Sequence, residues 1–315
     1  MTRATRLAQT NAMATYLAGS AFSRWTAVLA DYWTLTKPEV NFLILITTFA
    51  GFYLASPASL SRSLPLFNTL LGTLLVASGA GTLNQYIERR FDAQMRRTAG
   101  RPLPAGRIHP SHALWFGVVL SVAGGFYLVV LVNLLASLLA LLTLSTYLLL
   151  YTPLKRKTPL CTLVGAFPGA VPPLIGWAGA RGSLSADAWL LYAVLFLWQF
   201  PHFMAIAWMY REDYARAGYR TLPLGPRQGR FMAWQTIVFS LALIPVSLIP
   251  AVLQRAGLVY FVAVLVLSSG FFYYASRLAF CRTNAMARRL LFASIVYLPL
   301  IFALMMFAKN GVANP

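Results

Sequence analysis

Long apolar runs cover most of this chain and limit what it can fold into. A helix that crosses the hydrocarbon core of a bilayer needs roughly 20 apolar residues, because each residue advances it by about 1.5 Å. Nine such runs are present: 40–57, 64–86, 111–132, 134–151, 160–180, 187–209, 231–253, 257–276 and 288–308. With 59% hydrophobic and only 10% charged residues, 315 residues cannot form the polar surface of a soluble protein. The sequence predicts an all-α, polytopic membrane protein with about nine transmembrane helices.

The basic residues are divided unevenly between the two sides that nine spans define. Of 26 Lys and Arg residues, only Arg62, Arg181, Arg255 and Lys309 fall on one side. The other 22 mark the cytoplasmic side, so we expect a cytoplasmic N-terminus and a C-terminus on the opposite side. Topology accounts for most of the net charge of +19, and nucleic acid is not expected as a partner.

The segment before the first apolar run has three arginines and no acidic residue before Asp31. Residues 1–36 are predicted to form a cytoplasmic tail, and residues 37–310 a single transmembrane domain in a lipid bilayer. A mitochondrial transit peptide shares this composition, but the segment has no clear cleavage signal. We therefore expect the bacterial cytoplasmic (inner) membrane rather than the mitochondrial inner membrane.

Four of the seven acidic residues lie where apolar runs end on the predicted cytoplasmic side, namely Glu88, Asp92, Glu212 and Asp213. Asn84, Glu88 and Asp92 are four residues apart, so a helix places them within about 80° on one face. Three oxygen donors in a row suit Mg²⁺, which completes its shell with water and substrate phosphate. The alternative is that these acids only neutralise neighbouring arginines at a wet helix end.

A six-residue pattern occurs twice, four spans apart. Residues 101–106 read Arg-Pro-Leu-Pro-Ala-Gly and residues 220–225 read Arg-Thr-Leu-Pro-Leu-Gly, and each copy follows an acidic helix end. The copies share side and orientation, which indicates two parallel four-helix repeats plus one helix around a central cavity. Two acidic clusters facing one cavity could hold metals that stabilise a departing diphosphate, and the arginines would bind its oxygens.

These motifs resemble those of the UbiA-type intramembrane prenyltransferases, and within that family the heme O synthase (protoheme IX farnesyltransferase) branch. Asn84, Glu88 and Asp92 match the family's Asn-x-x-x-Asp-x-x-x-Asp motif, with Glu at the middle position. Residues 151–156 match the family's Tyr-x-x-x-Lys-Arg motif. Stretches typical of the branch are 95–103, 169–177, 198–203 and 213–218. The resemblance covers about residues 33 to 305. One departure is Met209, which stands where other family members carry a further aspartate of the second motif.

The resemblance implies that farnesyl diphosphate alkylates a vinyl group of heme b, that water adds, and that heme O and diphosphate form. It implies Mg²⁺ as cofactor and a heme A synthase as a later partner. The expected catalytic residues are Asn84, Glu88, Asp92, Tyr151 and Asp213. All of these except Tyr151 are also the expected metal ligands. The residues expected to bind the substrates are Arg97, Arg101, Lys155, Arg156, Arg220 and His202.

His202 lies deep within a predicted span, about 12 Å below the cytoplasmic edge, whereas His109 and His112 lie at the interfacial start of the third span. It could contact heme, since a neutral imidazole binds heme iron, or form a hydrogen bond within the bundle. Small residues of the fifth span, including Gly165, Gly169 and Gly176, could likewise leave a slot for heme or allow close helix packing.

Two other functions remain open at this stage. A prenyltransferase for an aromatic or quinone precursor would favour an aspartate-rich second motif, which this chain lacks. A membrane transporter would place its buried charges near mid-membrane rather than at one face.

Overall fold

The computed structural model describes residues 25–56, 63–223, 225–253 and 256–312, and within these ranges the regular structure is helical, without strands. Nine segments of this part of the chain are long and apolar enough to cross a membrane. They are α2 (Pro38–Ala55), α3 (Ser63–Asp92), α4 (Pro110–Leu131), α5–η1–α6 (Leu134–Ser145, Thr146–Tyr151 and Thr152–Leu154), α7–α8 (Cys161–Gly169 and Pro172–Arg181), α9 (Ala186–Met209), α11 (Arg227–Val252), α12 (Leu258–Cys281) and α13 (Asn284–Val312). The predicted nine-span all-α fold is confirmed. Residues 1–24 of the predicted tail lie outside the described ranges.

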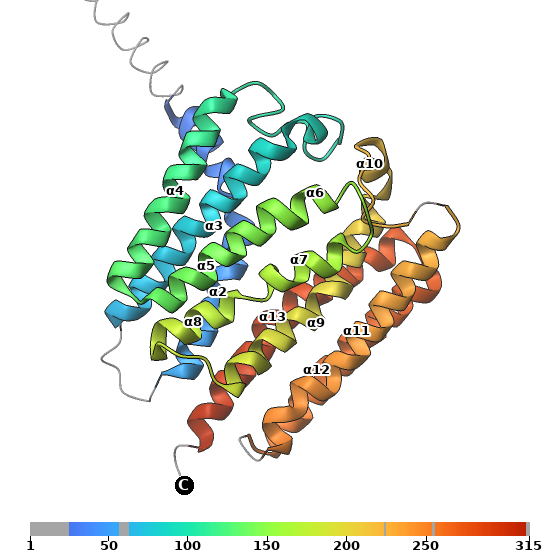
Figure 1. The fold of residues 1–315 in the computed structure, drawn as a ribbon. Helices are drawn as coiled ribbons and strands as arrows, with labels where there is room; N and C mark the ends of the chain where they lie inside the picture. The colour runs from blue at the N-terminus through green and yellow to red at the C-terminus, as the bar shows by residue number, and fades with distance from the viewer. Residues whose placement is uncertain (1–24, 57–62, 224, 254–255, 313–315) are drawn as a thin grey trace, which may run out of the picture.

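The spans form two groups of packed helices (Figure 1). One group contains α2, α3, α4 and α5, and the other contains α9, α11, α12 and α13. The broken span α7–α8 joins them, because α7 packs against α9 and α8 packs against α2. The 93–109 connection, the end of α6 and the short helix α10 (Arg211–Arg216) lie at one end of the bundle, opposite the end of α13. The segments with the predicted site residues therefore meet at one end.

Two spans are interrupted where proline removes a backbone donor. In the fourth span, Thr146–Tyr151 forms a wider π-helical turn just before Pro153, whose ring would clash with an ordinary helix. In the fifth span, α7 ends at Gly169 and α8 begins at Pro172, so the chain is broken at Ala170 and Val171. The apolar run placed this span correctly at 160–180 but did not reveal the break.

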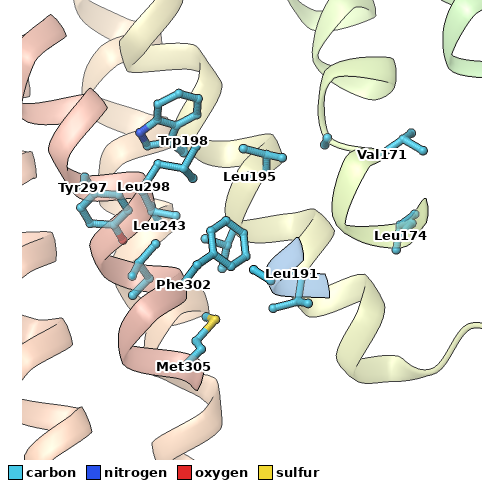
Figure 2. Packing of buried hydrophobic residues seen from close by; sticks show 14 of the residues in the cluster. Val171, Leu174, Leu191, Leu195, Trp198, Leu243, Tyr297, Leu298, Phe302 and Met305 are labelled. Atoms are coloured by element: carbon cyan, nitrogen blue, oxygen red, sulfur yellow. The ribbon is translucent and has the colours of Figure 1, made fainter. Parts of the chain in front are cut away.

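The core between α9 and α13 consists of large apolar side chains (Figure 2). Phe302 and Leu298 of α13 point toward α9, where Leu191 and Leu195 lie. The outer surface is apolar as well, since Phe126 is 69% exposed and Val259 is 84% exposed. Exposed apolar side chains on this scale are stable only where they contact lipid.

Helices α2 and α8 approach so closely that glycine is required at the contact. A Cβ atom on Gly176 would lie 1.9 Å from the carbonyl oxygen of Thr48, and one on Gly51 would lie 2.1 Å from that of Pro173. A Cβ on Gly169 would lie 2.1 Å from Oε1 of Gln199. Close packing thus accounts for these glycines of the fifth span, as the alternative interpretation expected, and a heme slot remains a prediction.

Two basic side chains bind the C-terminal end of α2, at the end of the bundle opposite the 93–109 connection. Arg181 donates from Nε to the carbonyl oxygen of Ala55 at 2.6 Å, and Lys309 donates to those of Tyr53, at 2.6 Å, and Ser56. Basic side chains at a helix C-terminus satisfy free carbonyl groups and oppose the helix dipole. Two of the four cations on this side thus have structural partners, whereas Arg62 and Arg255 lie outside the described residues.

Candidate active site

The last turns of α3 carry a buried row of polar side chains. Asn84, Glu88 and Asp92 are 1%, 6% and 1% exposed, and their spacing of four residues places them on one helix face. A buried carboxylate is stable only when it is paired or hydrogen-bonded. The surroundings of these three side chains therefore decide their role.

Each of these side chains binds a cation from a different segment of the chain. The pairs are Lys37 Nζ with Asn84 Oδ1 at 2.5 Å, Lys155 Nζ with Glu88 at 2.9 and 3.2 Å, and Arg101 Nη1 with Asp92 Oδ2 at 2.7 Å. The alternative in which the acids neutralise their sequence neighbours Arg89, Arg90 and Arg96 is not what the structure shows. The polar row is instead surrounded by Lys37 and Lys155, which are distant in the sequence, and by Arg101.

The irregular end of the fourth span positions Lys155. The π-helical turn lets Thr152 accept a hydrogen bond from Asn84 Nδ2 at 3.2 Å, and Lys155 follows one turn later. The ammonium lies 4.6 Å from the centre of the Tyr151 ring and 5.9 Å from that of Tyr219. Burial opposes the charge on Lys155, but the Glu88 carboxylate outweighs it, so the pKa of Lys155 is well above its ordinary value. Lys155 therefore remains a cation.

Tyr219, which the sequence did not single out, lies against the same carboxylate. Burial, and then the Glu88 charge, raise the pKa of Tyr219, so its phenol stays neutral. Its ring packs with Phe91, Tyr214, Met95 and Ala217 in a small cluster that joins the end of α3 to the segment after α10. The only sequence signal for Tyr219 was its position after the second acidic motif. That signal does not distinguish it from other tyrosines.

Lys37 is the second site residue that the sequence did not identify, because it was counted only as a topology charge. It adopts φ 55° and ψ 62°, a left-handed conformation that is unusual for lysine, directly before Pro38. Residues 25–35, which the sequence placed in the tail, form a helix here, and Gln85 donates to the carbonyl oxygens of Thr34 and Leu35 at 3.0 and 3.1 Å. Gln85, the residue next to Asn84, thus holds the helical segment that precedes Lys37.

The second acidic motif contributes one carboxylate to this region. Asp213 of α10 accepts a hydrogen bond from the backbone N–H of Arg97 at 3.4 Å and pairs with Arg216. This contact joins the two motifs across 116 sequence positions. The Glu212 side chain is 86% exposed and stays in solvent. The thinned second motif therefore offers Asp213 alone.

The two copies of the six-residue pattern agree at two equivalent positions. Leu103 and Leu222 are both buried, at 6% and 4% exposure. Gly106 and Gly225 both have left-handed φ angles, of 71° and 72°. Agreement in leucine burial and in glycine conformation supports the interpretation of a structural repeat.

The remaining predicted basic residues lie around this region in different ways. The guanidinium of Arg97 lies 4.8 Å from the Tyr210 ring centre, and that of Arg156 lies 4.2 Å from the Phe91 ring centre. The backbone N–H of Arg220 donates to the carbonyl oxygen of Lys155 at 2.6 Å, and its side chain is exposed. The backbone contact brings the second copy of the pattern next to Lys155.

The His202 side chain makes its contacts within the helix bundle. Its Nδ1 lies 2.7 Å from the Ser294 hydroxyl of α13, and its ring stacks on Trp198 at 4.7 Å between centres. The Trp198 indole N–H also donates to the Ser294 carbonyl oxygen, at 2.9 Å. The hydrogen bond expected by the alternative interpretation is present, and contact with heme stays a prediction.

The donor set at the end of α3 suits Mg²⁺ by its chemistry. It consists only of carboxylate and amide oxygens, which Mg²⁺ prefers, and leaves positions for water and phosphate. Among the described residues, no three His, Cys, Asp or Glu side chains are grouped closely enough to hold a metal by themselves. The residues therefore fit a metal whose shell the substrate completes rather than an all-protein cage.

Comparison with known proteins identifies the family of this chain. Residues 44–307 match the UbiA prenyltransferase family. A protoheme IX farnesyltransferase of Solibacter usitatus is 48% identical over 292 residues, covering 90% of this chain and all of the relative. Among solved structures, one described as digeranylgeranylglyceryl phosphate synthase shares the fold at 16% identity, with a TM-score of 0.72 over 90% of this chain and 99% of the other. A UbiA homologue from Archaeoglobus fulgidus bound to DMAPP and Mg²⁺ does so at 16% identity, with a TM-score of 0.57 over 87% and 99%. With its nine apolar spans, this chain is an integral membrane protein that belongs to the UbiA prenyltransferase family.

Proposed function

We propose that this protein transfers the farnesyl group of farnesyl diphosphate to a vinyl group of heme b, with addition of water, giving heme O and diphosphate. The observation that carries the proposal is the ring of Lys37, Arg101 and Lys155 around the polar row of α3, at one end of an apolar bundle. The bacterial relative at 48% identity bears the name protoheme IX farnesyltransferase. Farnesyl diphosphate likewise has a charged diphosphate end and an apolar chain. It therefore matches a protein with cations at one end of an apolar bundle.

In the proposed reaction, the bond between farnesyl C1 and the diphosphate oxygen breaks, and its electron pair leaves with diphosphate. C1 then bonds to the terminal carbon of the vinyl group, while a water oxygen bonds to the inner vinyl carbon and releases a proton. The cations of Lys37, Arg101 and Lys155 would exchange part of their present pairing for the diphosphate oxygens. Arg97, Arg156 and Arg220 would complete this basic shell.

The proposed Mg²⁺ ligands are Asn84, Glu88, Asp92 and Asp213. When bound, Mg²⁺ supplies Lewis-acid charge to the leaving diphosphate. The solved Archaeoglobus fulgidus homologue, which holds DMAPP and Mg²⁺, supports this assignment by analogy of fold. The Tyr151 ring, 4.6 Å from the Lys155 ammonium, would lie beside the carbon that develops positive charge.

We place the protein in the bacterial cytoplasmic membrane with a cytoplasmic N-terminus. The excess of basic residues at the end of the bundle that carries the candidate site supports this orientation. Heme b would lie deeper than the diphosphate, near His202. A heme A synthase would be the enzyme that accepts the product.

The test is the heme content of membranes from a bacterial strain that lacks heme O and expresses this chain. Chromatography of extracted hemes should show a new hydroxyethylfarnesyl heme, absent with the Asp92→Ala variant. Membranes that contain only heme b would contradict the proposal. A prenylated quinone precursor in the same extract would instead indicate the other prenyltransferase activity.

A further inference from the structure

A groove of about 670 Å³ lies between α12 and α13, and none of its lining residues belongs to the candidate active site. Its walls are residues spaced along one face of each helix, and the most informative are Val266, Gly270 and Tyr274 of α12 with Arg289, Phe292 and Val296 of α13. From Arg289 to Val296 the helix rises about 10 Å. The groove thus runs along the helices, with a basic end and an apolar body.

The floor of the groove is well packed and apolar. Phe271 and Tyr297 stack there with their ring centres 4.9 Å apart, and they are 3% and 1% exposed. The Tyr297 hydroxyl is occupied by Ser247 and Ser268, each at 3.0 Å, so the floor presents ring carbon atoms. These contacts leave dispersion and apolar burial as the forces available to a ligand here.

Gly270 keeps the groove open. In the part of the chain that the structure describes, no atom beyond its own helix lies within 4 Å of the position that a Cβ on Gly270 would occupy. This differs from Gly176, whose missing side chain allows two backbones to touch. At Gly270 the missing side chain leaves space instead.

Arg288 and Arg289 lie at the basic end of the groove, near the start of α13. Both side chains are exposed, and no ion pair among the described residues involves either of them. Two adjacent guanidinium groups without a carboxylate can bind a phosphate group through paired N–H donors. Since α13 ends at the opposite end of the bundle, these groups lie at the end that carries the candidate site (Figure 1).

We propose that this groove binds an anionic phospholipid. The phosphate would bind Arg288 and Arg289, and one acyl chain would lie along Phe292, Gly270 and Val266 over the stacked rings. Basic pockets between transmembrane helices on the cytoplasmic side recognise anionic head groups in this way. A second copy of this chain fits the surface poorly, because a two-fold contact uses the same patch on both copies and the described residues that line this groove include no carboxylate to pair with the arginines.

The test is native mass spectrometry of the full-length, delipidated protein in detergent, titrated with dioleoylphosphatidylglycerol or dioleoylphosphatidylcholine. The parent protein should bind phosphatidylglycerol about tenfold more tightly than phosphatidylcholine. Arg288→Gln combined with Arg289→Gln should remove this preference and leave phosphatidylcholine binding unchanged. Gly270→Leu should weaken both lipids, because its side chain fills the groove without meeting another atom at Cβ.

The matched control is Arg277→Gln, an exposed arginine of α12 outside the groove lining, which should behave as the parent. No variant should unfold in detergent at a lower temperature than the parent, which separates loss of binding from loss of fold. Equal phosphatidylglycerol binding by the double variant and the Arg277→Gln control would overturn the proposal. A dimer mass that Gly270→Leu abolishes would overturn it as well, since it would identify a second copy as the occupant.

Discussion

Lys155, just after the fourth span, donates to both carboxylate oxygens of Glu88 in α3, at 2.9 and 3.2 Å, across 67 sequence positions. Their side chains are only 14% and 8% exposed. Neither charge would be stable at this depth without the other. The same pair joins two spans and holds two residues of the candidate site, so its removal has consequences for both fold and binding.

Lys155→Met should destabilise the protein by about 3–5 kcal/mol, because it leaves the Glu88 carboxylate buried without its cation. Thermal or denaturant unfolding in detergent measures this change. Adding Glu88→Gln to the same chain removes the orphaned charge and should recover much of the lost stability. Equal stability of the single and the double variant would show that the two side chains are not coupled.

Removal of the metal should stop turnover. Asp92→Ala deletes one of the proposed Mg²⁺ ligands and should lower kcat by more than the roughly 10–100-fold typical of losing an outer-shell partner. Chelator should abolish the activity of the parent protein, and added Mg²⁺ should restore it. The variant should still insert and show parent-like helical content. Parent-level turnover in the presence of chelator would remove Mg²⁺ from the proposed function.

Arg101→Lys should raise the KM for farnesyl diphosphate about tenfold, because lysine keeps the charge but loses the planar fork that binds two oxygens. Arg101 pairs with Asp92 at 2.7 Å, within the polar row. Arg96→Lys is the control, since Arg96 is exposed and makes no ion pair among the described residues. Steady-state kinetics should separate the two variants, and an unchanged KM in Arg101→Lys would leave that residue as a topology charge.

His202 and Tyr151 should affect different substrates. His202→Ala should weaken use of heme b more than use of farnesyl diphosphate, whereas Tyr151→Ala should lower the chemical step. Ser294→Ala serves as the control, because it removes the hydrogen-bond partner of His202 and keeps the imidazole. Kinetics with each substrate varied separately decide the matter. If His202→Ala and Ser294→Ala weaken the use of heme b and the use of farnesyl diphosphate to the same extent, His202 has a packing role only.

Glycine substitutions should separate close packing from open space. Gly176→Ala should destabilise the protein by about 1–3 kcal/mol, because its Cβ would lie 1.9 Å from the Thr48 carbonyl oxygen and would push α8 from α2. Gly270→Ala meets no neighbour and should raise stability slightly through better helix propensity. Unfolding of both variants in the same detergent provides the comparison, and a neutral Gly176→Ala would contradict the close contact.

Hydropathy and helix periodicity were enough to predict the spans and the polar row of α3. Each apolar run must satisfy its backbone hydrogen bonds within itself when it enters a bilayer, so its length and composition decide its structure locally. The spacing of Asn84, Glu88 and Asp92 likewise determines that they share a face on any helix. Motif resemblance then pointed correctly to the family, since the motifs recur together along most of the chain.

The tertiary structure alone decided which cation meets which polar group. Lys37 reaches Asn84 across 47 positions, and Lys155 reaches Glu88 across 67. Such contacts depend on how helices cross and where proline interrupts them, as at Pro153 and Pro172, and hydropathy carries no information about either. The sequence by itself therefore determined the membrane class, the spans and the polar row on α3. Packing surrounded that row with cations from other segments and made it a candidate site, because a buried charge is stable only where another segment brings it a partner.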